Sequence, residues 1–204
     1  MKQVKLDSNF KLVLTGFGKV GYGAREILEL LPIKEVSPAE FISQSFDEAV
    51  FTHLDKEDYY QHESDGEIVV EEFYENPEGH ISTLNKYVEH ADMYMACHFW
   101  DNEAPKLLTH ADIQNSKNLK VIADISCDIA DPIASTLRPS TIADPLYGYN
   151  RDTQSEADWQ IEGNLVVMAV DNLPCELPKE ASEDFGKQLI SNVIPHLLNG
   201  DPEG

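Results

Sequence analysis

The strongest constraint on how this chain folds is the run of residues 10–31, where an apolar segment, a Gly-x-Gly-x-x-Gly turn and an amphipathic segment follow one another. This order predicts a strand followed by a helix over residues 19–31, the start of a dinucleotide-binding βαβ unit. Gly16 permits the tight turn, Gly18 lets bare backbone approach a pyrophosphate, and Gly21 lets the helix pack closely on the sheet. A glycine-rich turn without a ligand is the alternative interpretation.

The start of this predicted helix is the second half of the motif. Its first N–H groups have no partner within the helix, and the positive end of the helix dipole points the same way, so the turn favours phosphate groups. Gly23, two positions after Gly21, is expected to extend the small surface through which the helix meets the sheet.

The remaining chain alternates apolar runs with helical patterns. Strands are predicted at residues 10–15, 33–36, 49–54, 93–100, 120–126 and 164–171, with a possible strand at 67–73 inside the acidic, irregular region 55–80. A helix is predicted at 79–90, and Ser37 caps a short helix that begins at Pro38. This alternation indicates a doubly wound α/β fold with a mostly parallel sheet, in one domain over residues 1–204.

The C-terminal segment carries the clearest helical pattern, over residues 178–199. An apolar stripe with i, i+4 spacing runs through Ala181, Phe185, Leu189, Val193 and Leu197. Pro195 is expected to bend or shorten this helix, and Gly200 to stop it.

The net charge of the chain limits which partners it can bind. The formal net charge is −22, which repels nucleic acid and anionic membranes, so neither is an expected partner. A dinucleotide is an anion too, and must be held by local dipoles.

Cys97, Cys127 and Cys175 lie far apart, which is typical of free thiols in a reducing compartment. With no apolar run of about 18 residues and no apolar N-terminal signal, we expect a cytoplasmic protein.

The histidines do not predict a metal site. None of His53, His62, His90, His98 and His110 shows the i, i+4 pairing or the Cys/His spacing of zinc ligands. We interpret them as surface or core side chains.

Five segments carry a family resemblance. They are residues 14–24, 94–100 with 104–109, 122–128, 141–145 and 170–182. The last, Val-Asp-Asn-Leu-Pro-Cys-Glu-Leu-Pro-Lys-Glu-Ala-Ser, is the most specific. Together they resemble the lysine-forming saccharopine dehydrogenases and lysine–ketoglutarate reductases of the alanine dehydrogenase/transhydrogenase superfamily, over nearly the whole chain.

The resemblance implies a nicotinamide cofactor, NAD or NADP, on the glycine turn. Gly16, Gly18, Lys19, Val20 and Gly21 would form its cradle, with Lys19 supplying a positive charge unless it is merely a solvated lysine.

The adenosine ribose is where the chain departs from its relatives. Ser37 stands where NAD-specific relatives carry an Asp that binds the ribose 2′-hydroxyl, and a serine there leaves NADP possible. Glu40 is a rival ribose ligand, or a solvated helix residue.

Other cofactor contacts are implied further along the chain. Phe99 would line the adenine or ribose pocket, with core packing as its alternative. Ile125 ends a central strand, where open α/β sheets bind ligands. Asp171, Asn172 and Leu173 would lie against the nicotinamide.

Three residues after Ile125 are the candidates for substrate contact. Ser126, Cys127 and Asp128 would lie at the lip of the crevice and contact a small amino-acid-type substrate. Ser126 and Asp128 have capping as an alternative role, and Cys127 has no paired histidine that would make it a nucleophile.

The resemblance also implies what the chain lacks. Family members carry a substrate domain ahead of this one, holding the Lys and His that move protons, and no residue here matches them. We therefore expect the cofactor-binding portion of an oxidoreductase acting on CH–NH groups, inactive alone, in a possible homo-oligomer. Alanine dehydrogenase-like reductive amination and a non-catalytic nucleotide-binding module are the alternatives.

Overall fold

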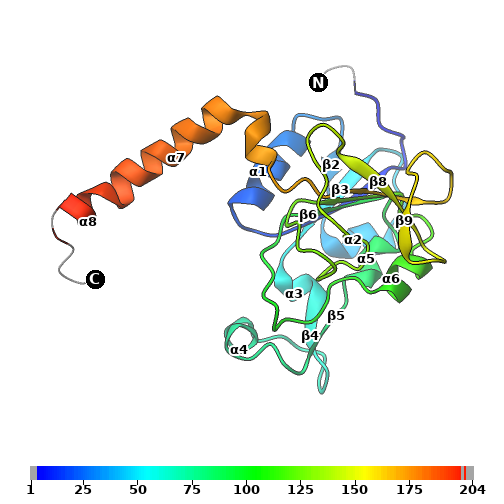
Figure 1. Ribbon diagram of the computed structural model, residues 1–204. Helices are drawn as coiled ribbons and strands as arrows, with labels where there is room; N and C mark the ends of the chain where they lie inside the picture. Colours follow the sequence, from blue (N-terminus) through cyan, green and yellow to red (C-terminus); the bar gives the residue numbers. More distant parts are fainter. Residues whose placement is uncertain (1–3, 199, 201–204) are drawn as a thin grey trace. The chain divides into compact units, whose positions relative to one another are not determined.

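The computed structural model describes residues 4–198 and 200 (Figure 1). The chain forms two compact units, Met1–Asp171 and Asn172–Gly204, which are taken in turn.

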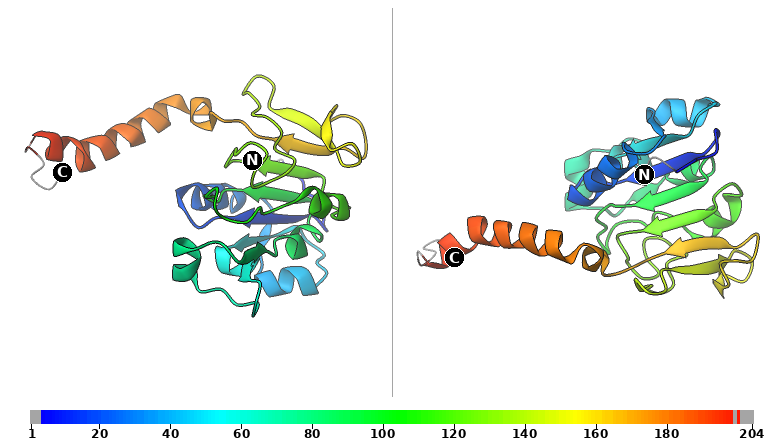
Figure 2. Two further views of the ribbon diagram at one scale, coloured as in Figure 1. Left: turned by 60° about the horizontal axis from the view of Figure 1, so that its bottom comes forward. Right: turned by 90° about the horizontal axis from the view of Figure 1, so that it is seen from above.

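The first unit is built on an eight-stranded sheet, seen from two further directions in Figure 2. The strands, in their order across the sheet, are β2 (Lys34–Glu35), β3 (Val50–Leu54), β1 (Lys11–Thr15), β6 (Met93–Ala96), β7 (Val121–Asp124), β10 (Leu165–Met168), β8 (Leu146–Asn150) and β9 (Ser155–Ala157). The first six are parallel to one another, β8 pairs antiparallel with β10, and β9 pairs antiparallel with β8. The predicted α/β class with a mostly parallel sheet is confirmed.

Helices cover both faces of this sheet. They are α1 (Lys19–Leu28), α2 (Pro38–Ser43), α3 (Lys56–Tyr59), α4 (Val70–Glu75), α5 (Asn85–Val88) and α6 (His110–Asn115). Strand β1 shows why both faces need cover. Val13 belongs to one buried cluster, with side chains of α2 to α6, while Leu12 and Leu14 pack with Leu28 of α1 in another. Burial on both faces is typical of a parallel strand.

Two predicted elements between residues 55 and 90 are wrong. Residues 67–73 do not form a strand, because α4 begins at Val70 and its Phe73 is buried against the core. Residues 79–90 are not one helix, because β5 (His80–Ser82) pairs antiparallel with β4 (Tyr60–His62), and only α5 is helical.

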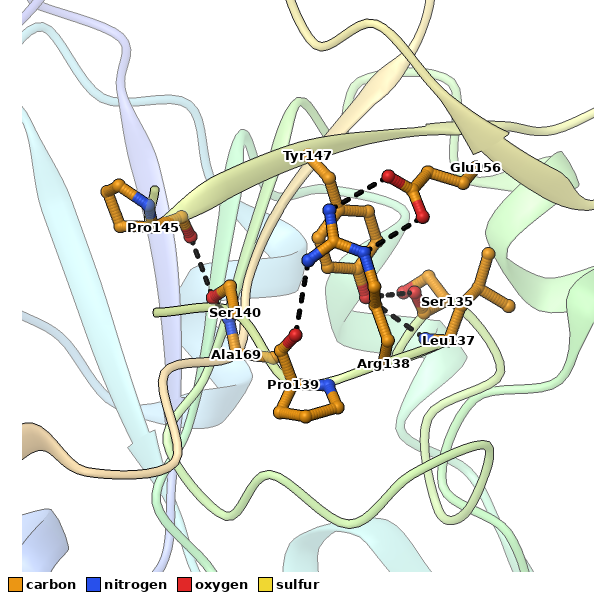
Figure 3. Close-up of polar contacts among 9 residues, drawn as sticks. All are labelled: Ser135, Leu137, Arg138, Pro139, Ser140, Pro145, Tyr147, Glu156 and Ala169. Atoms are coloured by element: carbon orange, nitrogen blue, oxygen red, sulfur yellow. Dashed lines mark hydrogen bonds and ion pairs between the residues drawn. The ribbon is translucent and has the colours of Figure 1, made fainter. Parts of the chain in front are cut away.

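The hairpin of β8 and β9 was not predicted. Figure 3 shows the polar contacts that fix it to the loop before β8. Arg138 makes a bidentate ion pair with Glu156, with Nε and Nη2 at 2.9 and 2.8 Å from the carboxylate oxygens. The Arg138 guanidinium lies 4.7 Å from the ring centre of Tyr147, whose hydroxyl donates to the Ser135 carbonyl at 2.9 Å.

Ser140 joins the same loop to the residue that follows β10 (Figure 3). Its buried hydroxyl donates to the Pro145 carbonyl at 2.9 Å and accepts from the Ala169 N–H at 3.0 Å. One side chain therefore satisfies two backbone groups after β7.

The second unit contains a short 3₁₀ helix, η1 (Leu173–Glu176), and the helices α7 (Pro178–Asn192) and α8 (Ile194–Leu198). The helix predicted over 178–199 is interrupted at Val193, two residues before Pro195, as expected from a ring that lacks an N–H and clashes with the preceding turn. Asn199, its predicted last residue, lies outside the described residues. Over residues 4–198 and 200, no helix has the length and apolar character needed to cross a membrane.

Candidate nucleotide site

The carboxyl ends of β1, β3, β6 and β7 surround a cavity of about 710 Å³, within the usual range for a small-molecule site. Its lining comprises Gly16, Phe17, Gly18, Lys19, Val20, Asp55, Lys56, Tyr59, Tyr60, Phe73, Tyr74, Pro77, Cys97, His98, Phe99, Trp100, Asp101, Glu103, Ala104, Ile125 and Ser126. Seven sequence-predicted site residues therefore share one cavity: Gly16, Gly18, Lys19, Val20, Phe99, Ile125 and Ser126.

The glycines of the turn fall into two kinds. Gly16 has φ +101°, and a Cβ there would lie 2.4 Å from the Cys97 carbonyl oxygen. A Cβ on Gly21 would lie 1.8 Å from the Gly16 oxygen, so the chain's own packing requires both glycines. Gly18 differs, because its φ of −89° suits any residue and a Cβ would meet nothing within 4 Å. Its open backbone faces the cavity.

Gly23 does not have the packing role expected of it. A Cβ at this position would also meet nothing within 4 Å, so this glycine does not bring α1 closer to the sheet.

His53 of β3 contacts the glycine turn through both a hydrogen bond and a stacked ring. Its Nε2 lies 2.6 Å from the Gly16 carbonyl oxygen, and the Phe17 ring stacks on its imidazole at 4.0 Å between ring centres. The turn is thus fixed by a hydrogen bond and a stacked ring before any ligand binds.

Lys19 and Val20 begin α1 and are exposed. Gly18, the N-cap, has no side chain to satisfy the first N–H groups of the helix. Those groups and the positive end of the helix dipole are free for an anion in the cavity.

Ser37 lies elsewhere in the structure than the sequence suggested. It follows β2, which β3 separates from β1, and it is not part of the cavity lining. Its hydroxyl donates to Glu40 Oε2 at 2.6 Å, and the Glu40 N–H donates back to Ser37 Oγ at 3.3 Å. This capping box for α2 occupies both Ser37 and its predicted rival Glu40.

Asp55, rather than Ser37, is the residue that lines the cavity at the end of the strand next to β1. It directly follows β3, the parallel neighbour of β1, and it lines the cavity. Its Oδ1 accepts from the Lys56 N–H at 2.8 Å and lies 3.3 Å from Lys56 Nζ. The sequence shows an acidic residue directly after the predicted strand 49–54. It does not show that this strand is the neighbour of β1, so Asp55 was not recognised as a candidate.

One side of the cavity is aromatic. The rings belong to Tyr59, Tyr60, Phe73, Tyr74, Phe99 and Trp100. Phe99 is 90% exposed, so its alternative role in core packing is excluded. Trp100 Nε1 and the Tyr60 hydroxyl both donate to the Pro105 carbonyl at 3.3 Å, which ties this wall together.

His98 sits deeper in the cavity wall, in a buried trio with Thr15 and Tyr94. Thr15 Oγ1 lies 3.0 Å from both the Tyr94 hydroxyl and His98 Nδ1. Burial lowers the pKa of His98 to about 4, so the imidazole is neutral near pH 7. Sequence reasoning treated this histidine as an ordinary side chain, since no spacing marks it.

The loop after β7 is organised by a buried carboxylate. Asp124 accepts from Ser126 Oγ and Thr136 Oγ1, both at 2.6 Å, and from the Cys127 N–H at 3.0 Å. These bonds hold Cys127 at φ 54°, with its thiol directed to the Ala169 carbonyl at 3.1 Å. Burial and the nearby acids raise the pKa of Cys127 to about 11, so the thiol stays protonated.

The remaining predicted residues are not in the cavity lining. Cys127 and Asp128 follow Ser126 but do not line the cavity, and Asp171 ends the first unit. Asn172 and Leu173 belong to the second unit, where Leu173 opens η1. The contact of Asp171, Asn172 and Leu173 with a nicotinamide stays a prediction, as does the contact of Cys127 and Asp128 with a substrate.

A second cavity of about 550 Å³ lies at the opposite, amino-terminal edge of the sheet. Its lysines already have partners: Lys11 donates to the Phe41 carbonyl, and Lys120 pairs with Asp92 at 2.7 Å. The first cavity is therefore the better candidate for an anionic ligand.

Comparison with known proteins assigns the family. The model of the alanine dehydrogenase/PNT C-terminal domain matches residues 47–201. The chain belongs to this family. The resemblance seen in the sequence is thereby confirmed.

Several relatives of this alanine dehydrogenase/PNT C-terminal domain are much longer than the chain. Mitochondrial alpha-aminoadipic semialdehyde synthase from Rattus norvegicus is 31% identical over 92% of this chain and 23% of that protein. The Arabidopsis thaliana synthase is 29% identical over 92% of this chain and 20% of that protein. Saccharopine dehydrogenase (NAD(+), L-lysine-forming) from Schizosaccharomyces pombe is 26% identical over 52% of this chain and 28% of that protein. The chain spans about a quarter of these relatives.

Proposed function

We propose that this chain is the NAD(P)-binding portion of an oxidoreductase acting on CH–NH groups, similar to saccharopine dehydrogenase. The observation that carries the proposal is the open backbone at Gly18, beside the unsatisfied N–H groups of α1 and inside the cavity. The name of the S. pombe relative, an NAD(+)-dependent saccharopine dehydrogenase, supports the reaction class.

The residues present fit a nicotinamide dinucleotide. Gly18, Lys19 and Val20 would hold the pyrophosphate at the start of α1. Asp55 would accept hydrogen bonds from the adenosine ribose, and its carboxylate would repel a 2′-phosphate. We therefore propose a preference for NAD(H) over NADP(H). Ser37, which left NADP possible in the sequence, does not line the cavity and has no part in this choice.

The chemistry divides between cofactor and protein. When bound, the nicotinamide supplies the hydride acceptor or donor. This chain would orient it and exclude water, with the aromatic wall and Ile125 as the apolar surfaces. Ser126, Cys127 and Asp128 would shape the lip where a small amino-acid-type substrate meets a further domain, which would supply the acid–base groups.

The first experiment is calorimetric titration of the chain with NADH and with NADPH. Gly18→Asp should abolish binding, because a carboxylate would stand where the phosphates bind, while the chain keeps its thermal melt. Gly23→Asp is the matched control, since its Cβ meets equally open space outside the cavity lining. Unchanged affinity of Gly18→Asp would contradict the proposed cradle.

The cytoplasmic location and the homo-oligomer stay proposals, the first supported by three separated cysteines without disulfides. Fractionation of cells expressing the natural protein tests the first, and light scattering the second.

A further inference from the structure

His98 has a ring nitrogen that the protein does not use. The residue follows β6, is 7% exposed and belongs to the cavity wall. Its Nδ1 is engaged by Thr15, but Nε2 is buried and has no partner among the described residues. An unpaired buried polar group is unfavourable and rare in folded proteins, so this nitrogen indicates a partner that arrives from outside the chain.

The hydroxyl protons of the trio decide what Nε2 carries. If the Tyr94 hydroxyl donates to Thr15 Oγ1 and the Thr15 hydroxyl donates to His98 Nδ1, both hydroxyl protons are used. The Tyr94 hydroxyl also lies 3.5 Å from His98 Nδ1, and any order with the imidazole proton on Nδ1 would leave the buried hydroxyl proton of Tyr94 or of Thr15 without an acceptor in the trio. We assign the first order, which puts the imidazole proton on Nε2 and makes it a donor.

The position of this donor points to the ligand. The Nε2–Cδ2 edge of an imidazole lies opposite Nδ1, so it is turned away from Thr15 and Tyr94. The glycine turn is in direct contact with the segment, because a Cβ on Gly16 would lie 2.7 Å from the His98 backbone nitrogen. The acceptors that a dinucleotide would bring beside this turn are phosphate and ribose oxygens.

We propose that His98 Nε2–H donates a hydrogen bond to a phosphate or ribose oxygen of the bound dinucleotide. The inference rests on the proposed function, and it deepens it by adding a ligand contact outside the glycine motif. As a neutral donor, His98 favours the ligand without the desolvation cost of a buried cation.

The test is titration of the full chain and its variants with NADH. His98→Phe keeps the ring and loses the donor, and we expect affinity about 5- to 50-fold weaker. His98→Gln places an amide N–H near Nε2 and should stay within about 3-fold of wild type. His80→Phe is the matched control, since His80 is also buried with an unpartnered Nδ1 but lies outside the cavity lining.

The outcomes separate the two proposals. Wild-type chain that binds neither NADH nor NADPH overturns the proposed function, and this inference with it. Wild-type binding with equal affinity in His98→Phe overturns only the role of His98.

A second measurement covers variants that fail to fold. Histidine ¹H–¹⁵N spectra of the wild-type chain should show a proton on His98 Nε2 whose resonance shifts as NADH saturates the site. An unshifted resonance, or a proton on Nδ1, would overturn the inference whatever the variants do.

Discussion

At the scale of residues, the structure separates groups that build the fold from groups left free for a ligand. Gly16 and Gly21 are in contact with backbone atoms and leave no room for a side chain. Gly18, Asp55 and His98 instead line one cavity, with an open backbone, a carboxylate and an imidazole whose Nε2 has no partner among the described residues. Stability and binding therefore depend on different residues of the same turn and strand ends.

Asp55 gives the first prediction at this scale. Asp55→Asn keeps one oxygen for the α3 cap but removes the charge and the second acceptor oxygen, so NADPH affinity should rise about 10-fold while NADH, which loses a ribose acceptor, binds more weakly. Asp58→Asn is the control, because Asp58 shares the capping box without lining the cavity. Parallel titrations measure the ratio, and an unchanged NADPH affinity would mean that Asp55 does not face the ribose.

His98 gives the second, through its lowered pKa. An unfolded histidine binds a proton below pH 6.5, whereas folded His98 does so only near pH 4. The unfolded state thus holds more protons in this window, and the free energy of unfolding should fall as the pH drops, by at most about 1.4 kcal/mol per pH unit. Urea melts of wild type and His98→Phe from pH 7 to about 4 compare the slopes. Equal slopes would contradict a neutral, buried His98.

At the scale of elements, sequence patterns predicted strands and helices better than strand order. The apolar runs at 10–15, 49–54 and 120–126 all became strands, because burial on both faces leaves a plain signal. The position of Ser37 was misjudged because β3, not β2, pairs with β1, and long-range pairing is not written in local composition. His98 escaped notice because its importance comes from an unpaired atom.

The hairpin β8–β9 gives the element-scale prediction. Ser140→Ala removes the one hydroxyl that serves both the Pro145 carbonyl and the Ala169 N–H, so the free energy of unfolding should fall by about 1–3 kcal/mol. Ser43→Ala, on an exposed hydroxyl of α2, should cost much less. Chemical denaturation measures both, and equal losses would show that the Ser140 contacts do not hold the loop.

At the scale of the whole molecule, the charge of −22 opposes every anion that approaches. The proposed ligand is an anion, and among the described residues the cavity lining contains two lysines, Lys19 and Lys56. Long-range repulsion then competes with short-range backbone dipoles, and the two respond differently to salt.

Salt dependence follows from that competition. Raising NaCl from about 20 to about 300 mM should strengthen NADH binding by roughly 2- to 5-fold, since screening weakens the distant repulsion more than the contacts at α1. Calorimetry at constant pH tests it. Binding that weakens steeply with salt would show that Lys19 and Lys56 dominate.

The open space at Gly18 also makes the cavity accessible to protein engineering. Gly18→Cys would place a thiol inside the cavity, beside the proposed phosphate position, without crowding the fold. Burial raises the pKa of Cys97 to about 12 and that of Cys127 to about 11, so both resist alkylation at neutral pH. With exposed Cys175 changed to Ser, a small alkylating reagent would react with residue 18 alone, and a ligand bound in the cavity would slow that reaction, so its rate would report access to the site.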